Sequence, residues 1–142
     1  MTDRPVVVAA LEAAVHRVLE HLAGELADLG LRQAEINVLA QLEPGRPRSV
    51  GALAAATGQR SSTLTGVLDR LEKRRLVRRR VNPADRRSFT IALTAGGERA
   101  AARVHAVFAT LDERVLADVP PSTADGFHSV LGAIERHTEA TP

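Results

Sequence analysis

The sequence predicts a mainly α-helical protein with one small β-hairpin, an α+β fold. Apolar residues recur at helical spacing near both ends of the chain, and two short helical segments meet at a glycine-containing turn at residues 57–60. An apolar/polar alternation occupies residues 77–94 around an Asn-Pro turn, as in a hairpin. A chain of 142 residues, of which 44% are hydrophobic, is long enough to bury a core of this kind.

The N-terminal helix is predicted from a stripe of apolar residues that recur every three or four positions and stop before Gly30, a residue type that often ends helices. The stripe consists of Leu11, Val15, Val18, Leu22, Leu26 and Leu29. A second helix is expected at residues 31–42, and the Pro- and Gly-rich loop at residues 44–47 ends it.

Two short helices follow in the middle of the chain. Ser49 is the predicted N-cap of the first, which ends at Gly58, and the second lies within residues 60–77. The apolar face of the second helix consists of Leu64, Val67, Leu68 and Leu71. Helices joined in this way form a helix-turn-helix pattern, and small hydroxyl side chains at the start of the second helix would let it approach the floor of a DNA groove.

The hairpin at residues 77–94 is expected to pack one face on the helices. That face consists of Val77, Val81, Phe89, Ile91 and Leu93. Asn82-Pro83 would start the turn, and Asp85 is placed to accept a hydrogen bond from Arg87 or a neighbouring arginine. A basic hairpin tip beside a helix-turn-helix predicts a winged helix, whose wing would enter the DNA minor groove.

The net charge of +2 hides a strong asymmetry along the chain. Residues 60–87 hold ten basic and three acidic residues, a net charge of +7, whereas the rest of the chain carries nine basic and fourteen acidic residues, a net charge of −5. Clustered arginine and lysine favour a polyanion partner because phosphate neutralisation releases counterions. A solvated charged surface is the alternative interpretation of composition alone.

Composition also excludes several classes of protein. The chain has no cysteine, so disulfides, iron–sulfur clusters and thiol chemistry are excluded. No apolar run is long enough to span a bilayer and no signal-peptide pattern is visible, so we expect a cytoplasmic protein. No GxSxG, HExxH or glycine-rich phosphate loop is present, so we expect neither an enzyme nor a cofactor.

A metal site is not expected either. Glu12, His16 and Glu20 lie four residues apart on the first predicted helix, but without a cysteine or a histidine four residues after His16 this spacing is more typical of a solvated helix face than of zinc ligands.

The order and spacing of motifs between about residues 31 and 97 resemble the MarR family of transcriptional regulators. The matching pieces are Ser49-Val50, Leu53-Ala54, Thr63-Leu64-Thr65, Leu68 through Lys73, Leu76-Val77, Arg79, Pro83, Asp85-Arg86-Arg87, Leu93-Thr94 and Gly97. Two positions depart from the family pattern. Arg75 stands where glycine is usual, so either the turn is rebuilt or about 1 kcal/mol of backbone strain is tolerated. Gly66 stands where relatives often carry a longer side chain.

The resemblance implies an obligate homodimer, in which each winged helix binds half of a pseudo-palindromic operator. It divides the chain into an N-terminal dimerisation helix (residues 1–30), a winged helix-turn-helix DNA-binding domain (31–94) and C-terminal dimerisation helices (95–142). The apolar residues near the C-terminus also favour a dimer, because their apolar surface is larger than one small winged helix can cover. The alternative is that these residues pack on their own domain. They are Val104, Val107, Phe108, Leu111, Val115, Phe127, Val130, Leu131 and Ile134.

The candidate DNA-contacting residues fall into three groups, each of which could instead be solvated surface. Those expected in the major groove are Ser62, Thr63, Thr65 and Arg70. Arg60 and Lys73 are expected on phosphates, and Arg86 and Arg87 in the wing, oriented by Asp85. Four other arginines are further candidates, and some of them are expected to pair instead with acidic groups of the helices; they are Arg74, Arg75, Arg78 and Arg80.

The resemblance also implies a small aromatic effector, often a phenolic acid, bound between the winged helix and the dimer helices. The candidate residues are His16, Arg17, His21, Asn37, Gln41 and His105. The function implied is that of a homodimeric repressor released by an effector. A constitutive or architectural winged-helix DNA-binding protein without a ligand is the alternative.

Overall fold

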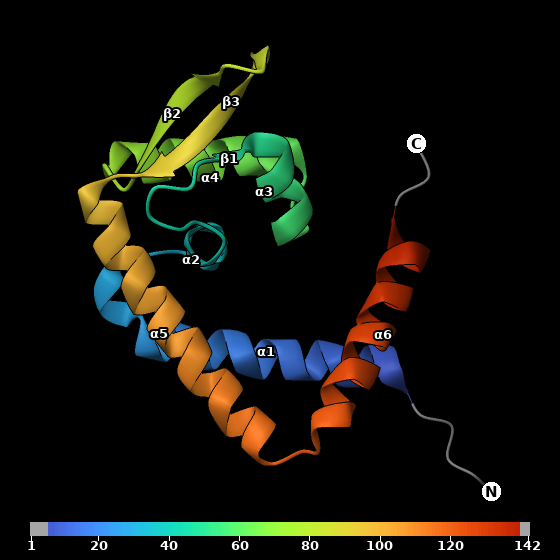
Figure 1. Ribbon diagram of the computed structural model, residues 1–142. Coiled ribbons are helices and arrows are strands. Elements are labelled where there is room, and N and C mark those ends of the chain that lie inside the picture. The colour runs from blue at the N-terminus through green and yellow to red at the C-terminus, as the bar shows by residue number, and fades with distance from the viewer. Residues whose placement is uncertain (1–5, 140–142) are drawn as a thin grey trace, which may run out of the picture. The chain divides into compact units, whose positions relative to one another are not determined.

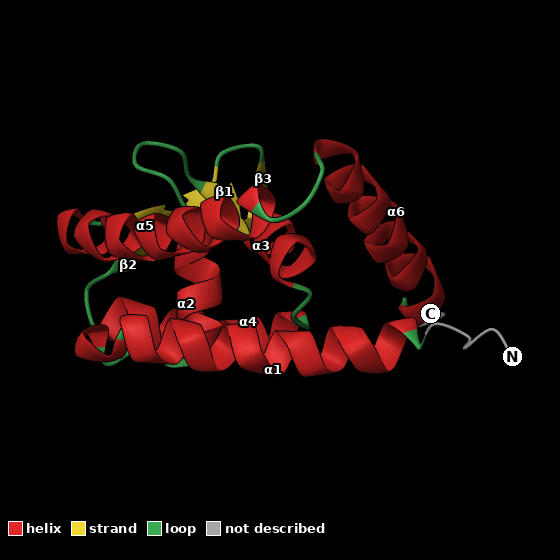
Figure 2. Ribbon diagram, turned by 90° about the horizontal axis from the view of Figure 1, so that it is seen from below, coloured by secondary structure: helices red, strands yellow, loops and turns green. Residues whose placement is uncertain are grey.

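The computed structural model of the protein describes residues 6–139 and confirms a mainly helical fold with a small β-sheet (Figure 1, Figure 2). In chain order the elements are α1 (Val7–Glu25), the short 3-10 helix η1 (Ala27–Leu29), α2 (Gln33–Ala40), β1 (Arg48–Ser49), α3 (Val50–Thr57), α4 (Ser61–Lys73), β2 (Val77–Asn82), β3 (Asp85–Leu93), α5 (Ala95–Ala117) and α6 (Pro121–Thr138). The chain forms two compact units, residues 1–107 and residues 108–142, and the boundary falls within α5.

The first two helices are shorter than the sequence predicts. The first was expected to continue to Leu29, but α1 ends at Glu25, because the backbone leaves the helical conformation at Leu26 and places that side chain, 1% exposed, in the core. A turn of 3-10 helix then leads to Gly30, which adopts a left-handed backbone with φ +60°. The second helix begins only at Gln33, after an extended Arg32.

The helix-turn-helix pattern is confirmed in detail. The Ser49 hydroxyl accepts a hydrogen bond from the Ala52 backbone N–H at 3.1 Å, as an N-cap does. Helix α3 ends at Gly58, whose φ of +66° is the left-handed conformation that favours glycine. Helix α4 follows two residues later and carries the short hydroxyl side chains at its start.

The core of the first unit lies where α2, α3 and α4 meet the base of the hairpin. The predicted apolar face of α4 is buried, and it packs with buried side chains of the other two helices and the strands. The largest fully buried side chains are Leu26, Ile36, Val38, Leu39, Leu42, Leu53, Leu64, Val67, Leu68, Leu71, Val77 and Ile91. This packing fixes the orientation of α4 within the unit.

The sheet is antiparallel with the order β1-β3-β2, and strand β1, which adds to the predicted hairpin, was not predicted. Strand β1 consists of only two residues, which pair with Ile91 and Thr90 of β3. Because β1 immediately precedes α3, this pairing ties the helix-turn-helix to the hairpin.

The prediction that five apolar hairpin residues pack on the helices was wrong for two of them. Val77, Ile91 and Leu93 are buried, but Val81 is 52% exposed and Phe89 is 45% exposed. The hairpin extends away from the helices of the first unit (Figure 1), so only the residues near its base are covered.

The second unit consists of the end of α5 and helix α6. Between residues 108 and 139 no residue is buried. Four large apolar side chains in this range are at least 40% exposed; they are Val115, Leu116, Phe127 and Val130. Within residues 6–139 no helix is both long and apolar enough to cross a membrane.

Candidate nucleic-acid interface

The first half of α4 presents a polar surface to solvent. Ser62, Thr63 and Thr65 are exposed, and Arg60, which precedes the helix in an extended conformation, is exposed as well. The Thr65 hydroxyl donates a hydrogen bond to the Ser61 carbonyl at 3.0 Å, so its oxygen remains able to accept one. The short side chains leave the helix N-terminus, with its unpaired backbone N–H groups, accessible to a polyanion.

Arg70 is held differently from these residues. Its Nε donates a hydrogen bond to Oε1 of Glu35 at 2.7 Å, and the Glu35 side chain is only 4% exposed. The other Glu35 oxygen accepts the Arg32 backbone N–H at 3.0 Å, at the start of α2. Arg70 is therefore anchored to a buried carboxylate of another helix, and 37% of its side chain remains exposed.

Gly66 leaves room beside this arginine. A Cβ atom at position 66 would lie 3.7 Å from Nη1 of Arg70, so the guanidinium group lies over the glycine. A longer side chain at this position would compete with the guanidinium group for the surface of α4.

Arg79 joins the hairpin to α4. Its guanidinium group forms an ion pair with Asp69, lies 3.7 Å from a carboxylate oxygen of Glu72 and donates to the Thr65 carbonyl at 3.5 Å. Its side chain is 23% exposed. Some of four other arginines were expected to form ion pairs with the helices; of these, Arg74 donates instead to the backbone carbonyls of Leu29 and Gly30, at 2.7 and 2.9 Å.

The turn of the hairpin is fixed by side chain to backbone hydrogen bonds. Oδ1 of Asn82 accepts the Ala84 N–H at 3.0 Å, as predicted for an Asn-Pro turn. Oδ1 of Asp85 accepts the backbone N–H of Arg87 at 3.0 Å and not its guanidinium group. Asp85 thus orders the backbone of the tip, and the side chains of Arg86 and Arg87 are exposed beside it.

The turn after α4 contains the backbone outlier that the family pattern indicated. Arg75 has φ +56°, and it is the only residue other than glycine with positive φ among residues 6–139. The turn is not rebuilt, so the backbone carries strain of roughly 1 kcal/mol. The Thr94 hydroxyl donates to the Arg75 carbonyl at 2.6 Å and accepts the Gly97 N–H at 3.0 Å, which ties this turn to the start of α5.

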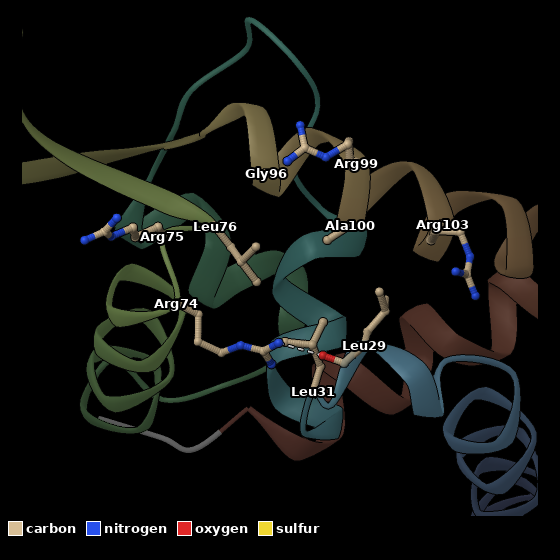
Figure 3. Close-up of a pocket in the computed structure, with 9 residues that line it drawn as sticks. All are labelled: Leu29, Leu31, Arg74, Arg75, Leu76, Gly96, Arg99, Ala100 and Arg103. Carbon is tan, nitrogen blue, oxygen red and sulfur yellow. Dashed lines mark hydrogen bonds between the residues drawn. The ribbon is translucent and has the colours of Figure 1, made fainter.

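A cavity of about 570 Å³ lies against this turn (Figure 3). Leucine and alanine side chains alternate in its lining with four arginines; the residues are Leu29, Leu31, Arg74, Arg75, Leu76, Gly96, Arg99, Ala100 and Arg103. Two of the arginines are engaged: Arg74 donates to the backbone carbonyls of Leu29 and Gly30, and Arg103 pairs with Asp28 at 2.8 Å. Among the described residues, the guanidinium groups of Arg75 and Arg99 have no hydrogen-bond or ion-pair partner. No carboxylate lines the cavity, so it favours anions.

The ion pair between Asp28 and Arg103 shifts the pKa values of both residues. The hydrogen bond from Arg103 holds the pKa of Asp28 below its ordinary value, and the same bond raises the pKa of Arg103. The pair links η1 to α5 at the rim of the cavity.

None of the six predicted effector-binding residues lines this cavity. His16 and Arg17 are exposed on α1, and His21 is half-buried. The other three take part in hydrogen bonds within the protein: Gln33 Nε2 to Asn37 Oδ1 at 2.8 Å, Arg48 Nη1 to Gln41 Oε1 at 3.2 Å, and His105 Nε2 with the Ala40 carbonyl at 3.2 Å. Within residues 6–139 no group of three or more His, Cys, Asp or Glu residues is arranged to hold a metal ion.

Sequence reasoning missed three features of this surface. Arg79 could have been found, because it lies two residues from both Val77 and Val81 and so falls on the same face of the strand, which is turned toward the helices. Glu35 could have been found too, because it shares a helix face with Val38, Leu39 and Leu42. The arginine-lined cavity had no local signal, since its lining comes from three separate segments.

A helix-turn-helix whose second helix exposes a polar face, beside a hairpin with a basic tip, defines a winged-helix DNA-binding protein. Comparisons with known proteins identify the family. A sequence model described as MarR family matches residues 28–88. The transcriptional repressor CouR, bound to a 23-mer DNA duplex, is 31% identical, and the match covers 88% of this chain and 89% of that chain with a TM-score of 0.70. The chain belongs to the MarR family and is a DNA-binding transcription regulator, not an enzyme.

Further solved structures agree with this fold. CouR from Rhodococcus jostii RHA1, bound to p-coumaroyl-CoA, is 26% identical over 96% of this chain and 95% of that chain, with a TM-score of 0.80. MepR of S. aureus in its DNA-binding conformation is 15% identical over 95% of this chain and 100% of that chain, with a TM-score of 0.85, and supports the fold alone. A search of curated proteins finds no significant match.

Proposed function

We propose that the protein is a cytoplasmic, homodimeric repressor in which each winged helix binds half of a pseudo-palindromic operator and a small-molecule effector releases the DNA. The observation that carries the DNA-binding part is the rigid attachment of the basic hairpin to α4. The ion pair between Arg79 and Asp69 and the pairing of β1 with β3 fix the two elements within one unit. A protein that contacts two adjacent DNA grooves needs its helix and its hairpin at a fixed spacing.

In this proposal the two exposed surfaces have separate tasks. Ser62, Thr63 and Thr65 contact bases in the major groove, where short hydroxyl side chains can accept or donate hydrogen bonds. Arg60 and Lys73, which are both exposed, contact phosphates. The CouR repressor, 31% identical, was solved with a DNA duplex, which supports DNA as the partner of this surface.

The exposed apolar surface of the second unit supports the homodimer. No described residue between 108 and 139 is buried, and 32 residues without a core are not expected to be stable alone. Helix α1 adds Val15 and Val18, which are 44% and 41% exposed at helical spacing on one stripe. A second copy of the chain would cover these residues.

The arginine-lined cavity supports an effector better than the six predicted residues do. Arg75 and Arg99, which have no partner among the described residues, belong to a lining that also contains leucine and alanine side chains, and a cavity of about 570 Å³ has the volume of a small-molecule site. Two similar proteins bind or respond to anionic compounds. CouR, 26% identical, was solved with p-coumaroyl-CoA, and the DNA binding of BpsR from Bordetella bronchiseptica, 23% identical, is regulated by 6-hydroxynicotinic acid. We place the effector, an organic anion with an apolar body, in this cavity.

The operator and the dimer are tested together by footprinting DNA that flanks the protein's own gene, with the mass in solution measured in parallel. We expect about twice 15.2 kDa and an inverted repeat whose half-sites lie one helical turn apart, ~10 bp. A stable monomer that protects one half-site would contradict the proposal.

The effector is tested by screening aromatic carboxylates and acyl-CoA thioesters for release of the footprinted fragment. Arg99→Ala should remove the response to an active compound and leave operator affinity unchanged, whereas Arg46→Ala, at an exposed arginine paired with Glu43 away from the cavity, should leave both unchanged. If no compound releases the DNA, the constitutive or architectural alternative is favoured.

A further inference from the structure

Two apolar side chains form an exposed pair on the wing. Val81 of β2 lies directly opposite Phe89 of β3, and the two are 52% and 45% exposed. The chain has only three phenylalanines and no tyrosine or tryptophan, so an aromatic side chain left in water is not a by-product of an aromatic-rich composition. We call Val81 and Phe89 the wing apolar pair.

The wing apolar pair lies on the face of the hairpin that is turned toward α4. Side chains two residues apart on a strand share a face, so Val81 lies on the same side as Arg79, whose guanidinium group contacts Asp69 on α4. The pair lies two residues, about 7 Å, farther along the strand than Arg79. It therefore lies between the point where the hairpin contacts α4 and the basic tip.

The surroundings of the pair are basic. The hairpin from residue 77 to residue 93 contains five arginines, and Asp85 is its only acidic residue. A second copy of this surface would bring like charges together, so self-association through the pair is disfavoured. A polyanion with apolar portions matches the surface in charge and in polarity.

DNA has this combination of properties at one place. A winged helix with α4 in the major groove and its hairpin tip in the adjacent minor groove straddles the sugar–phosphate strand that separates the two grooves. The phosphates of that strand are charged, but the C–H groups of its deoxyriboses are apolar. The wing apolar pair lies between helix and tip, where this strand must pass.

We infer that the wing apolar pair packs on deoxyribose C–H groups of the strand between the two grooves and excludes water there. The inference rests on the proposed use of the helix and the wing in DNA binding. The contact involves no base edge and no charge, so it strengthens binding to operator and non-operator DNA alike. Water exclusion beside the tip also strengthens the phosphate contacts of the neighbouring arginines, because charge interactions are stronger where the local dielectric is low.

The test compares charge-neutral variants in the full-length protein on a footprinted operator and on an unrelated duplex. Phe89→Ala should weaken binding to both DNAs by ~10-fold per half-site, as expected from the apolar area that the ring buries. The salt dependence should be unchanged, because no ionic contact is lost. Phe89→Leu should retain most of the affinity. Thr90→Ala is the matched control, because Thr90 is the next residue of the same strand and faces the other side; it should bind as the wild type does.

Hydroxyl-radical footprinting supplies a second readout, since the radical removes hydrogen atoms from exposed deoxyriboses. The wild type should protect sugars on the strand between the two grooves, and Phe89→Ala should lose that protection while major-groove methylation protection persists. Circular dichroism and thermal melting establish that each variant is folded. A change in melting temperature with unchanged DNA affinity would mean that the pair only stabilises the hairpin, and it would overturn the inference.

The outcome for Arg87→Ala separates this inference from the proposed function. If Arg87→Ala weakens binding and folded Phe89→Ala does not, the wing contacts DNA without the apolar pair, and the inference alone is refuted. If both folded variants bind as the wild type does, the wing does not contact DNA and the proposed function fails as well.

Discussion

The ion pair between Arg70 and Glu35 makes Arg70 a structural residue as well as a candidate base contact. In Arg70→Ala, the Glu35 carboxylate, whose side chain is 4% exposed, would lose its charged partner at 2.7 Å. Removing one partner of a fully buried pair costs about 3–5 kcal/mol. Water reaches Arg70, which is 37% exposed, and Glu35 keeps its bond from the Arg32 N–H, so we expect a loss of ~2 kcal/mol.

The assay is urea unfolding at one fixed protein concentration, because the stability of a dimer depends on concentration. Glu35→Gln combined with Arg70→Ala should be less destabilised than Arg70→Ala alone, since no unpaired buried charge remains. Competition among operator variants then measures whether Arg70 also reads bases. Unchanged stability in Arg70→Ala, with the double variant no more stable than the single one, would refute this reasoning.

Two further predictions concern the turn after α4 and the start of α5, and a third concerns the ion pair that links η1 to α5. Gly97→Ala should prevent stable folding, because a Cβ atom there would lie 1.8 Å from the Leu76 carbonyl oxygen. Gly96→Ala is the control and should fold, because its Cβ atom would lie 3.6 Å from the nearest neighbouring atom. Circular dichroism measures folding in both variants, and a folded Gly97→Ala protein would contradict the packing at this turn. Arg75→Gly should raise the free energy of unfolding by ~1 kcal/mol in urea, since φ +56° is strained for arginine, and a less stable variant would mean that the side chain contributes more than the strain costs. Arg103 lowers the pKa of Asp28, so their pairing stabilises the fold above the ordinary aspartate pKa of about 3.9, and this stabilisation is lost as the pH falls through the lower pKa of the folded state. Asp28→Asn should therefore remove this part of the acid destabilisation. Acid unfolding curves that coincide for the wild type and the variant would count against it.

The helix-turn-helix could be predicted from sequence because its signals are local. The Ser49 cap, the Gly58 turn and the leucine and valine stripe of α4 each specify one conformation, and together they fix the core. The left-handed backbone at Arg75 could also be anticipated, from the glycine that relatives carry there.

The rest depended on distances that a pattern does not contain. The alternation at residues 77–94 indicates which side chains share a face, but not how far the helices extend beneath the hairpin, so the exposure of Val81 and Phe89 was missed. The Arg70–Glu35 bond spans 35 residues, and the cavity brings together residues as distant as Leu29 and Arg103. Such contacts follow from tertiary packing, for which the sequence has no local signal.

The salt dependence of operator binding by Arg87→Ala tests most directly whether the hairpin is a DNA wing. Arg87 is exposed at the tip beside the backbone bond to Asp85. If its side chain contacts DNA in both subunits, the variant should bind operator and non-operator DNA ~1–3 kcal/mol more weakly, and its slope of log K against log salt should be shallower by about two. A folded Arg87→Ala protein with unchanged affinity and unchanged slope would show that the hairpin does not contact DNA.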